Sequence, residues 1–102
     1  PLGQLRLLAI ARALAQRPSV LLLDEPAAGL RAGEKARLIE ALQTLSRSGL
    51  TMVLVEHDMQ FVGALAERVV VLDRGRVIAD GTPDRIRSDP LVIAAYLGSS
   101  SL

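Results

Sequence analysis

Two short apolar runs on either side of a helical pattern restrict the fold of this chain more than any other feature. Residues 20–23 lie between two prolines, and Thr51–Val55 is apolar and rich in β-branched residues. Runs of this length are typical of buried strands. Residues 34–46 between them space their apolar side chains as a helix does, and Gly49 provides a stop. We therefore predict a strand–helix–strand unit whose two strands are adjacent and parallel.

The rest of the chain divides into similar short elements. Residues 5–15 are apolar nearly all round and predict a buried helix. Beyond the second strand we expect a helix capped by Asp58 and ending at Leu65, then a hairpin of residues 69–72 and 76–79 around Arg74-Gly75. Two short helices should follow, begun by Thr82-Pro83 and Asp89-Pro90. Gly98 should end the last helix, and residues 99–101 should form a frayed tail. The fold class is α/β, with parallel strands flanked by helices, then a C-terminal β-hairpin and short helices.

Composition limits both the core and the partners. Half of the 102 residues are hydrophobic but only Phe61 and Tyr96 are aromatic, so the core is aliphatic. The net charge is +1 and the basic residues are scattered, which argues against a nucleic-acid partner. Cysteine is absent, which excludes a disulfide scaffold and a thiolate metal site. No apolar run is long enough for a membrane span, so a membrane role has to depend on a partner.

Both predicted parallel strands are of the kind that is buried on both faces of a sheet. Few of the 102 residues remain to cover them. We therefore expect this chain to expose a large apolar surface, and we expect residues 1–102 to form a single partial domain rather than a complete one.

Two adjacent carboxylates, Asp24 and Glu25, end the first strand. Ligands bind beyond the carboxyl ends of strands in open α/β sheets. Side chains alternate along a strand, so the two carboxylates should point in different directions and could serve different purposes. One could bind Mg²⁺ on a phosphate through water, and the other could act as a general base on an attacking water. The alternative is a solvated acidic turn.

His57, the only histidine, follows the second strand and should lie at the same edge of the sheet as Glu25. A neutral imidazole there could donate to a phosphate oxygen. A histidine without a role, or a metal-binding pair with Asp58, are the alternatives. At the start of the chain, Gly3-Gln4 opens a helix whose backbone N–H groups favour an anion, although many helices begin after a glycine.

The order and spacing of these motifs resemble the ABC ATPase family across essentially the whole chain. The resemblance implies that Gly3-Gln4 ends the signature motif and binds the ATP of an opposing subunit. Residues 21–24 would then be the Walker B strand, with Asp24 directed at Mg²⁺ through water and Glu25 as the catalytic glutamate. Residues 27–31 would form the D-loop, and His57 would be the catalytic switch histidine.

A narrower resemblance is to the ATPases of branched-chain amino-acid importers. It is carried by residues 24–30, 55–59, 71–75 and 92–98, of which the closing segment lies outside the general ATPase motifs. Four positions depart from the family pattern, and one of them is Leu7, where related sequences often carry a basic residue. Pro1 and Leu2 stand where the signature motif usually has Ser and Gly, and Arg31 replaces the usual Asp or Asn of the D-loop.

The resemblance implies the C-terminal part of an ABC transporter ATP-binding subunit on the cytoplasmic face of the membrane. ATP and Mg²⁺ are the implied cofactors. The implied partners are a second ATP-binding subunit, transmembrane permease subunits and, indirectly, a periplasmic or extracellular solute-binding protein. The 102 residues contain no G-x-x-x-x-G-K-[S/T] phosphate loop, so we expect this chain alone to be inactive. The alternatives are an ABC-type ATPase in DNA repair or translation and a non-enzymatic, partner-binding fragment.

Overall fold

The computed structural model describes residues 1–97. The chain divides into two compact units, Pro1–Leu65 and Ala66–Leu102. We call them unit 1 and unit 2 and describe each by itself. The single partial domain therefore stays a prediction. The expected stop at Gly98 and the tail over residues 99–101 lie outside the described residues.

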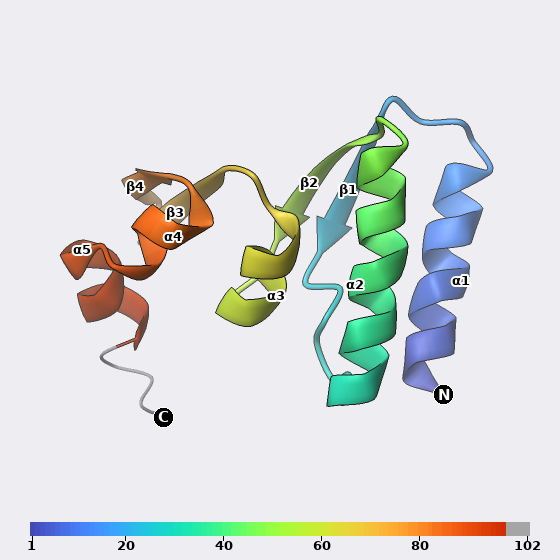
Figure 1. Ribbon diagram of the computed structural model, residues 1–102, viewed down its shortest axis with the longest axis horizontal. Coiled ribbons are helices and arrows are strands. Elements are labelled where there is room, and N and C mark those ends of the chain that lie inside the picture. The colour runs from blue at the N-terminus through green and yellow to red at the C-terminus, as the bar shows by residue number, and fades with distance from the viewer. Residues whose placement is uncertain (98–102) are drawn as a thin grey trace. The chain divides into compact units, whose positions relative to one another are not determined.

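Unit 1 is the expected strand–helix–strand arrangement with one further helix on each side. Its elements in order are α1 (Leu2–Leu14), β1 (Val20–Asp24), α2 (Ala32–Arg47), β2 (Thr51–Val55) and α3 (Met59–Leu65) (Figure 1). The strands pair in parallel, with Val20 opposite Thr51 and Asp24 opposite Val55. Gly49, with φ of 97°, allows the chain to turn sharply out of α2 into β2. The parallel pairing predicted from the sequence is confirmed.

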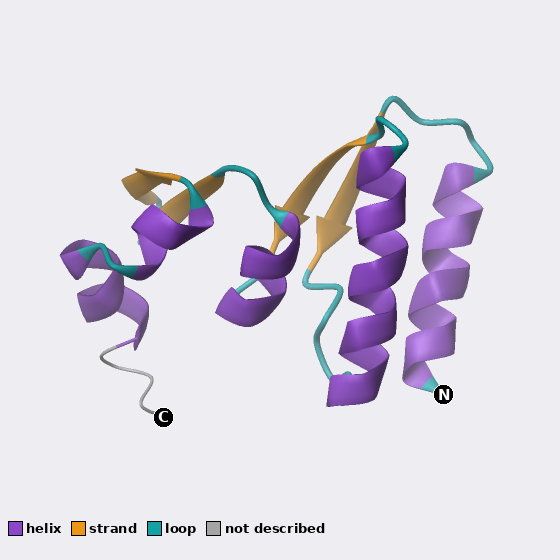
Figure 2. Cartoon of the chain, viewed as in Figure 1, coloured by secondary structure: helices purple, strands orange, loops and turns teal. Residues whose placement is uncertain are grey.

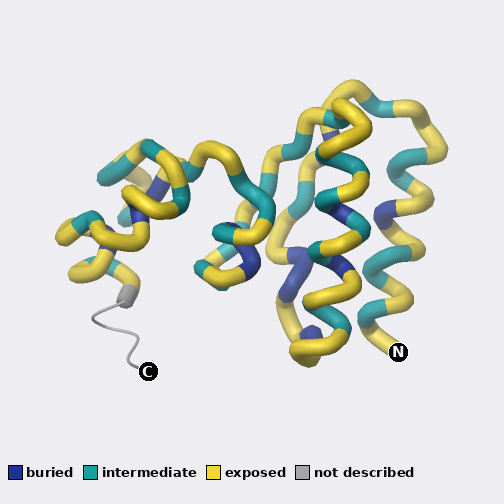
Figure 3. Tube along the Cα trace, in the orientation of Figure 1, coloured by how far each residue is buried: buried dark blue, intermediate teal, exposed yellow. Residues whose placement is uncertain are grey.

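The core of unit 1 lies between one face of this sheet and the helices (Figure 3). Leu42 on α2 is 0% exposed and Phe61 on α3 is 1% exposed. Leu21 of β1 and Ile10 of α1 complete the contact from the other elements. This aliphatic core with a single phenylalanine matches the expectation from composition.

The opposite face of the sheet is open. Val20 and Leu22 of β1 and Val53 and Val55 of β2 are all exposed, Leu22 to 73%. The strands are therefore buried on one face only, because no described element covers the other, and the expected apolar surface is confirmed. The prediction of a buried helix at residues 5–15 is wrong for the same reason. Helix α1 begins earlier, at Leu2, and Ile10 is its one buried residue.

Unit 2 contains the predicted hairpin followed by short helical segments (Figure 2). The elements are β3 (Val69–Asp73), β4 (Arg76–Gly81), α4 (Pro83–Arg87), α5 (Pro90–Val92) and a π-helical turn, η1 (Ile93–Leu97). Arg74 and Gly75 form the tight turn with φ of 51° and 79°. Two successive positive φ values suit the twist of an antiparallel hairpin, so this turn is as the sequence predicted.

Short-range capping bonds organise the second half of unit 2. The hydroxyl of Thr82 accepts from the N–H of Arg85 at 3.3 Å, and Asp89 accepts from Leu91 N–H at 2.8 Å, so both predicted caps are confirmed. The hydroxyl of Tyr96 donates to the carbonyl oxygen of Leu72 on β3. A small core forms from side chains that are at most 8% exposed, namely Val71, Ile86 and Val92.

None of the described helices combines the length and the apolar character that a membrane crossing requires.

Candidate functional site

The candidate site begins where β1 ends. Asp24 is the last residue of the strand, and Glu25 takes the left-handed backbone conformation with φ of 45°. The N–H of Glu25 donates to the carbonyl oxygen of Val55 at 2.7 Å, which holds this turn against β2. The strand therefore ends at Asp24, and Glu25 lies in a turn. The direction of the Glu25 side chain is set by this turn and not by strand alternation. Left-handed non-glycine residues are uncommon and gather at functional sites.

The structure brings Glu25 and His57 together. The Nδ1 atom of His57 lies 2.7 Å from the Oε1 atom of Glu25. Both side chains are accessible, with 71% of His57 and 50% of Glu25 exposed. A carboxylate can only accept, so this contact places the proton on Nδ1. The two residues that the sequence predicted at one edge of the sheet are therefore neighbours, 32 positions apart in the chain.

Asp24 lies beside a shallow pocket of about 200 Å³ between α1 and β1. Arg6 and Pro26 also line this pocket. The Asp24 carboxylate is exposed, and within residues 1–97 no hydrogen bond or ion pair is recorded for it. Free carboxylate oxygens are hard ligands of the kind that Mg²⁺ prefers, directly or through water. Asp24 therefore fits the role of a magnesium-directed group.

Gly3 and Gln4 open α1, away from the contact between Glu25 and His57. The N–H of Gly3 donates to the Oε2 atom of Glu34 on α2 at 2.8 Å, and Gln4 is exposed. A Cβ atom at position 3 would lie 2.7 Å from that same oxygen, so a larger residue there would require the Glu34 side chain to shift. The anion expected at this helix start is, in this structure, a carboxylate of the chain itself.

The other oxygen of Glu34 accepts from the N–H of Arg31 at 3.0 Å. The hydrogen bonds from the Arg31 and Gly3 N–H groups hold the pKa of the Glu34 carboxyl below its ordinary value of 4.5. Glu34 thus joins the start of α1 to the end of the loop over residues 25–31, which we call the β1–α2 loop.

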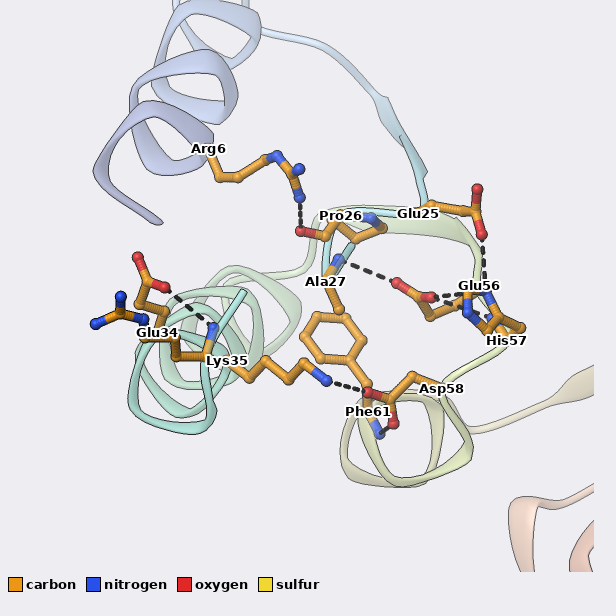
Figure 4. A network of polar contacts seen from close by, with 11 residues as sticks. Arg6, Glu25, Pro26, Ala27, Glu34, Lys35, Glu56, His57, Asp58 and Phe61 are labelled. Carbon is orange, nitrogen blue, oxygen red and sulfur yellow. Dashed lines mark hydrogen bonds and ion pairs between the residues drawn. The ribbon is translucent and has the colours of Figure 1, made fainter. Parts of the chain in front are cut away.

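Two further side chains fix the β1–α2 loop (Figure 4). Arg6 on α1 donates to the carbonyl oxygens of Pro26 and Ala28, the latter at 2.8 Å. Glu56, between β2 and His57, accepts from the N–H of Ala27 at 3.0 Å. The sequence analysis missed Arg6, Glu34 and Glu56. Only Glu34 had a readable signal, because a glutamate three residues after a helix-start position is a common capping arrangement.

Asp58 is used within the fold. It accepts from the N–H of Phe61 at 3.1 Å, as the predicted cap, and from the Nζ atom of Lys35 at 2.8 Å. The hydrogen bond from Lys35 is the main cause that lowers the pKa of Asp58. One oxygen of Asp58 therefore serves the helix cap and the other serves the ion pair with Lys35.

Comparisons with known proteins show what this chain is similar to. A family model described as "Branched-chain amino acid ATP-binding cassette transporter" matches residues 76–100. The branched-chain amino acid transport ATP-binding protein BraF of Pseudomonas aeruginosa is 46% identical over 99 residues, which are 96% of this chain and 39% of the relative. LivG of Escherichia coli K12, described in the same terms, is 43% identical with the same coverage.

A solved structure agrees with these relatives. The ADP conformation of MJ1267, described as an ATP-binding cassette of an ABC transporter, superposes with a TM-score of 0.85 at 31% identity. The match covers 94% of this chain and 39% of that one. The chain thus spans about two fifths of the length of the proteins it matches.

The fold, with a short parallel sheet, a β-hairpin and short helices, matches part of an ABC ATPase domain. Within that class the chain is similar to BraF and LivG, which are ATP-binding proteins of branched-chain amino acid transport. The resemblance predicted from the motifs is confirmed.

Proposed function

We propose that this chain belongs to the ATP-binding subunit of an ABC importer that couples ATP hydrolysis to the transport of branched-chain amino acids. The observation that supports this best is the 2.7 Å contact between Glu25 and His57 at the carboxyl edge of a parallel sheet. A solvated acidic turn without a function does not require a contact with the histidine that follows the next strand. The similarity to BraF and LivG supports the choice of substrate.

Each predicted residue receives a role in this proposal. Glu25 is the general base that accepts a proton from the attacking water, and its half-exposed side chain leaves room for that water. Asp24 binds Mg²⁺ through water, because its carboxylate has no other partner among residues 1–97. Bound Mg²⁺ supplies charge neutralisation at the phosphates. Gly3 and Gln4 bind the ATP of the opposing subunit, and for this the N–H of Gly3 has to exchange Glu34 for a phosphate oxygen.

The role of His57 changes in one respect from the sequence expectation. A neutral imidazole carries one N–H group, and the contact with Glu25 uses the one on Nδ1. Donation to a γ-phosphate oxygen therefore requires that His57 release Glu25 or carry both protons. In the proposal His57 senses the phosphate through this exchange.

The partners of the proposed subunit are a second ATP-binding subunit and transmembrane permease subunits. The solute-binding protein outside the membrane acts only through the permease. The proposed location is the cytoplasmic face of the membrane. The 102-residue chain alone should release no phosphate from ATP, because it lacks the lysine-bearing phosphate loop.

Three substitutions in a full-length subunit carrying these residues test the assignment. Glu25→Gln should lower turnover by about 10²–10⁴-fold and leave ATP binding intact, because an amide cannot accept the proton. Asp24→Asn should weaken Mg²⁺-dependent nucleotide binding. His57→Ala should slow hydrolysis with little change in affinity. Phosphate release and nucleotide titration measure these effects, and Glu40→Gln, an exposed carboxylate on α2, is the control.

The opposite pattern would overturn the assignment. Near-normal turnover of Glu25→Gln, combined with loss of hydrolysis but not of Mg²⁺-nucleotide affinity in Asp24→Asn, would mean that the two carboxylates have exchanged roles. Normal behaviour of all three variants would leave an acidic turn without catalytic function.

A further inference from the structure

One buried carboxylate has no part in the proposed reaction. The side chain of Glu56 is only 1% exposed, whereas those of Glu25 and His57 beside it are largely accessible. Burial of a carboxylate is unfavourable unless hydrogen bonds replace the lost water. The partners of Glu56 therefore indicate what the residue does.

Both oxygens of Glu56 accept hydrogen bonds from the backbone. Oε2 accepts from the N–H of Ala27 at 3.0 Å, and Oε1 accepts from the N–H of His57 at 3.1 Å. Ala27 is itself only 3% exposed, so water does not compete freely for its N–H group. Hydrogen bonds to a charged acceptor are stronger than those between neutral groups.

The two backbone groups that Glu56 holds belong to the two segments that meet in the site. Ala27 lies two positions after Glu25, and the N–H of the next residue, Ala28, donates to the Glu25 carbonyl at 3.1 Å. His57 supplies the other N–H group. The Glu25–Val55 backbone bond also joins these segments, but it acts at the first residue of the turn. The bond from the Ala27 N–H to Glu56 holds the same turn two residues further along the chain.

From this arrangement we propose that Glu56 is a positioning residue, which locks the β1–α2 loop to the backbone of His57 and so sets the contact between Glu25 and His57. Its effect on catalysis rests on the proposed function. Glu56 touches neither water nor nucleotide in this role. It acts through Glu25 and His57, whose reactive atoms must be held in place because small displacements of catalytic groups lower rates strongly.

The proposal predicts a separation between catalysis and binding. In a full-length subunit, Glu56→Ala should lower kcat by about 10²-fold, the effect expected for a displacement of about 1 Å. Glu56→Gln keeps one acceptor and should lower kcat by about 10-fold, which corresponds to one lost hydrogen bond. The KM for Mg-ATP should change less than about twofold in both, because Asp24 and the phosphate-binding groups remain. Glu40→Gln is the matched control.

Amide hydrogen exchange supplies a readout that does not depend on activity. Exchange at Ala27 and His57 should accelerate by about 10-fold in Glu56→Ala, the equivalent of one hydrogen bond, and should not change in Glu40→Gln. A merely stabilising residue would instead lower protection evenly through unit 1 and leave kcat unchanged at a temperature where the protein is folded. Should Glu56→Ala fail to fold, the isosteric Glu56→Gln decides.

The outcomes for the two proposals are distinct. Wild-type kcat and wild-type exchange at Ala27 in the Glu56 variants, with Glu25→Gln inactive, would overturn the positioning role and keep the proposed function. If the unmodified subunit does not hydrolyse ATP, the proposed function fails. Exchange at Ala27 and His57 then still shows whether Glu56 locks the loop.

Discussion

Unit 1 and unit 2 hold their loops in different ways. In unit 1, most of the side chains that fix the β1–α2 loop and the start of α1 come from positions 20 to 31 residues away, as in Arg6–Pro26, Ala27–Glu56 and Gly3–Glu34, and the bond from Arg31 to Glu34 is the local exception. In unit 2 the caps at Thr82 and Asp89 span three and two residues. The bond from Tyr96 to Leu72, 24 positions apart, and the ion pair of Arg68 and Asp80, 12 positions apart, are the longer-range contacts that the structure describes there.

This difference distinguishes structure that a short segment forms by itself from a functional site whose geometry depends on distant segments. A cap or a tight turn can form from its own short segment, and a substitution there has a local effect. A loop held from three other elements keeps its geometry only when those elements are folded. Glu25, one of the two candidate catalytic residues, lies on the second kind of loop, and His57 contacts it from the segment after β2.

The largest expected effect comes from the two cores. Leu42→Ala in unit 1 and Ile86→Ala in unit 2 should each lower the free energy of unfolding by about 2–5 kcal/mol, because both side chains are buried. Amide exchange should show protection lost mainly in the unit that carries the substitution. The exposed Leu22→Ala should change stability by less than about 0.5 kcal/mol. Equal loss of protection in both units would remove the distinction between them.

A medium effect is expected at the caps. Asp58→Ala removes the bonds from both Phe61 N–H and Lys35, and it should cost about 1–2 kcal/mol. Thr82→Ala removes one bond at 3.3 Å and should cost about 0.5–1 kcal/mol. Denaturant unfolding followed by circular dichroism measures both, with Asp58→Asn as the variant that keeps a capping oxygen. A larger cost at Thr82 would reverse the comparison.

The smallest expected effect is the change in stability with pH and salt that comes from one carboxyl group in each unit. Arg31 and Gly3 N–H groups lower the pKa of Glu34 below 4.5, and the Arg68 guanidinium lowers the pKa of Asp80 below 3.8. Since the folded pKa lies below the unfolded one, each group stabilises the fold above its ordinary pKa. That stability is lost as the pH falls through the folded pKa.

Salt should distinguish the two carboxyl groups. The pKa of Asp80 depends on an exposed cation, so about 1 M salt should return it toward 3.8. The pKa of Glu34 depends first on backbone hydrogen bonds and should stay below 4.5. NMR titration of the side-chain carboxyls at low and high salt gives both values. A Glu34 pKa that returns to 4.5 in salt would mean that charge, and not hydrogen bonding, holds it.

The local features of both units could be predicted from the sequence. The Arg74-Gly75 turn and the caps at Asp58, Thr82 and Asp89 each depend on a few neighbouring residues. The parallel pairing followed from the strand–helix–strand pattern. The neighbourhood of Glu25 and His57 then followed, because parallel strands end at the same edge.

The contacts that position the loop could not be predicted. Arg6, Glu34 and Glu56 bond to backbone groups of segments that become neighbours only in the folded unit. Apart from Glu34, which stands at a common capping position, these residues resemble ordinary surface residues in the sequence. The burial of α1 was predicted wrongly for a related reason. An apolar helix is buried only where another element covers it, and the sequence of the helix does not show which element that is. Leu5 and Leu8 are exposed here.

The bond from the Tyr96 hydroxyl to Leu72 also has a spectroscopic consequence. Tyr96 is the single tyrosine, tryptophan is absent, and the one phenylalanine, Phe61, absorbs and emits weakly. Near-ultraviolet fluorescence of this chain therefore reports on unit 2, where Tyr96 is tied to β3. Unit 1, which carries the candidate catalytic residues, is almost silent at these wavelengths. A fluorescence melting curve of the unmodified chain would follow the hairpin and would miss the site.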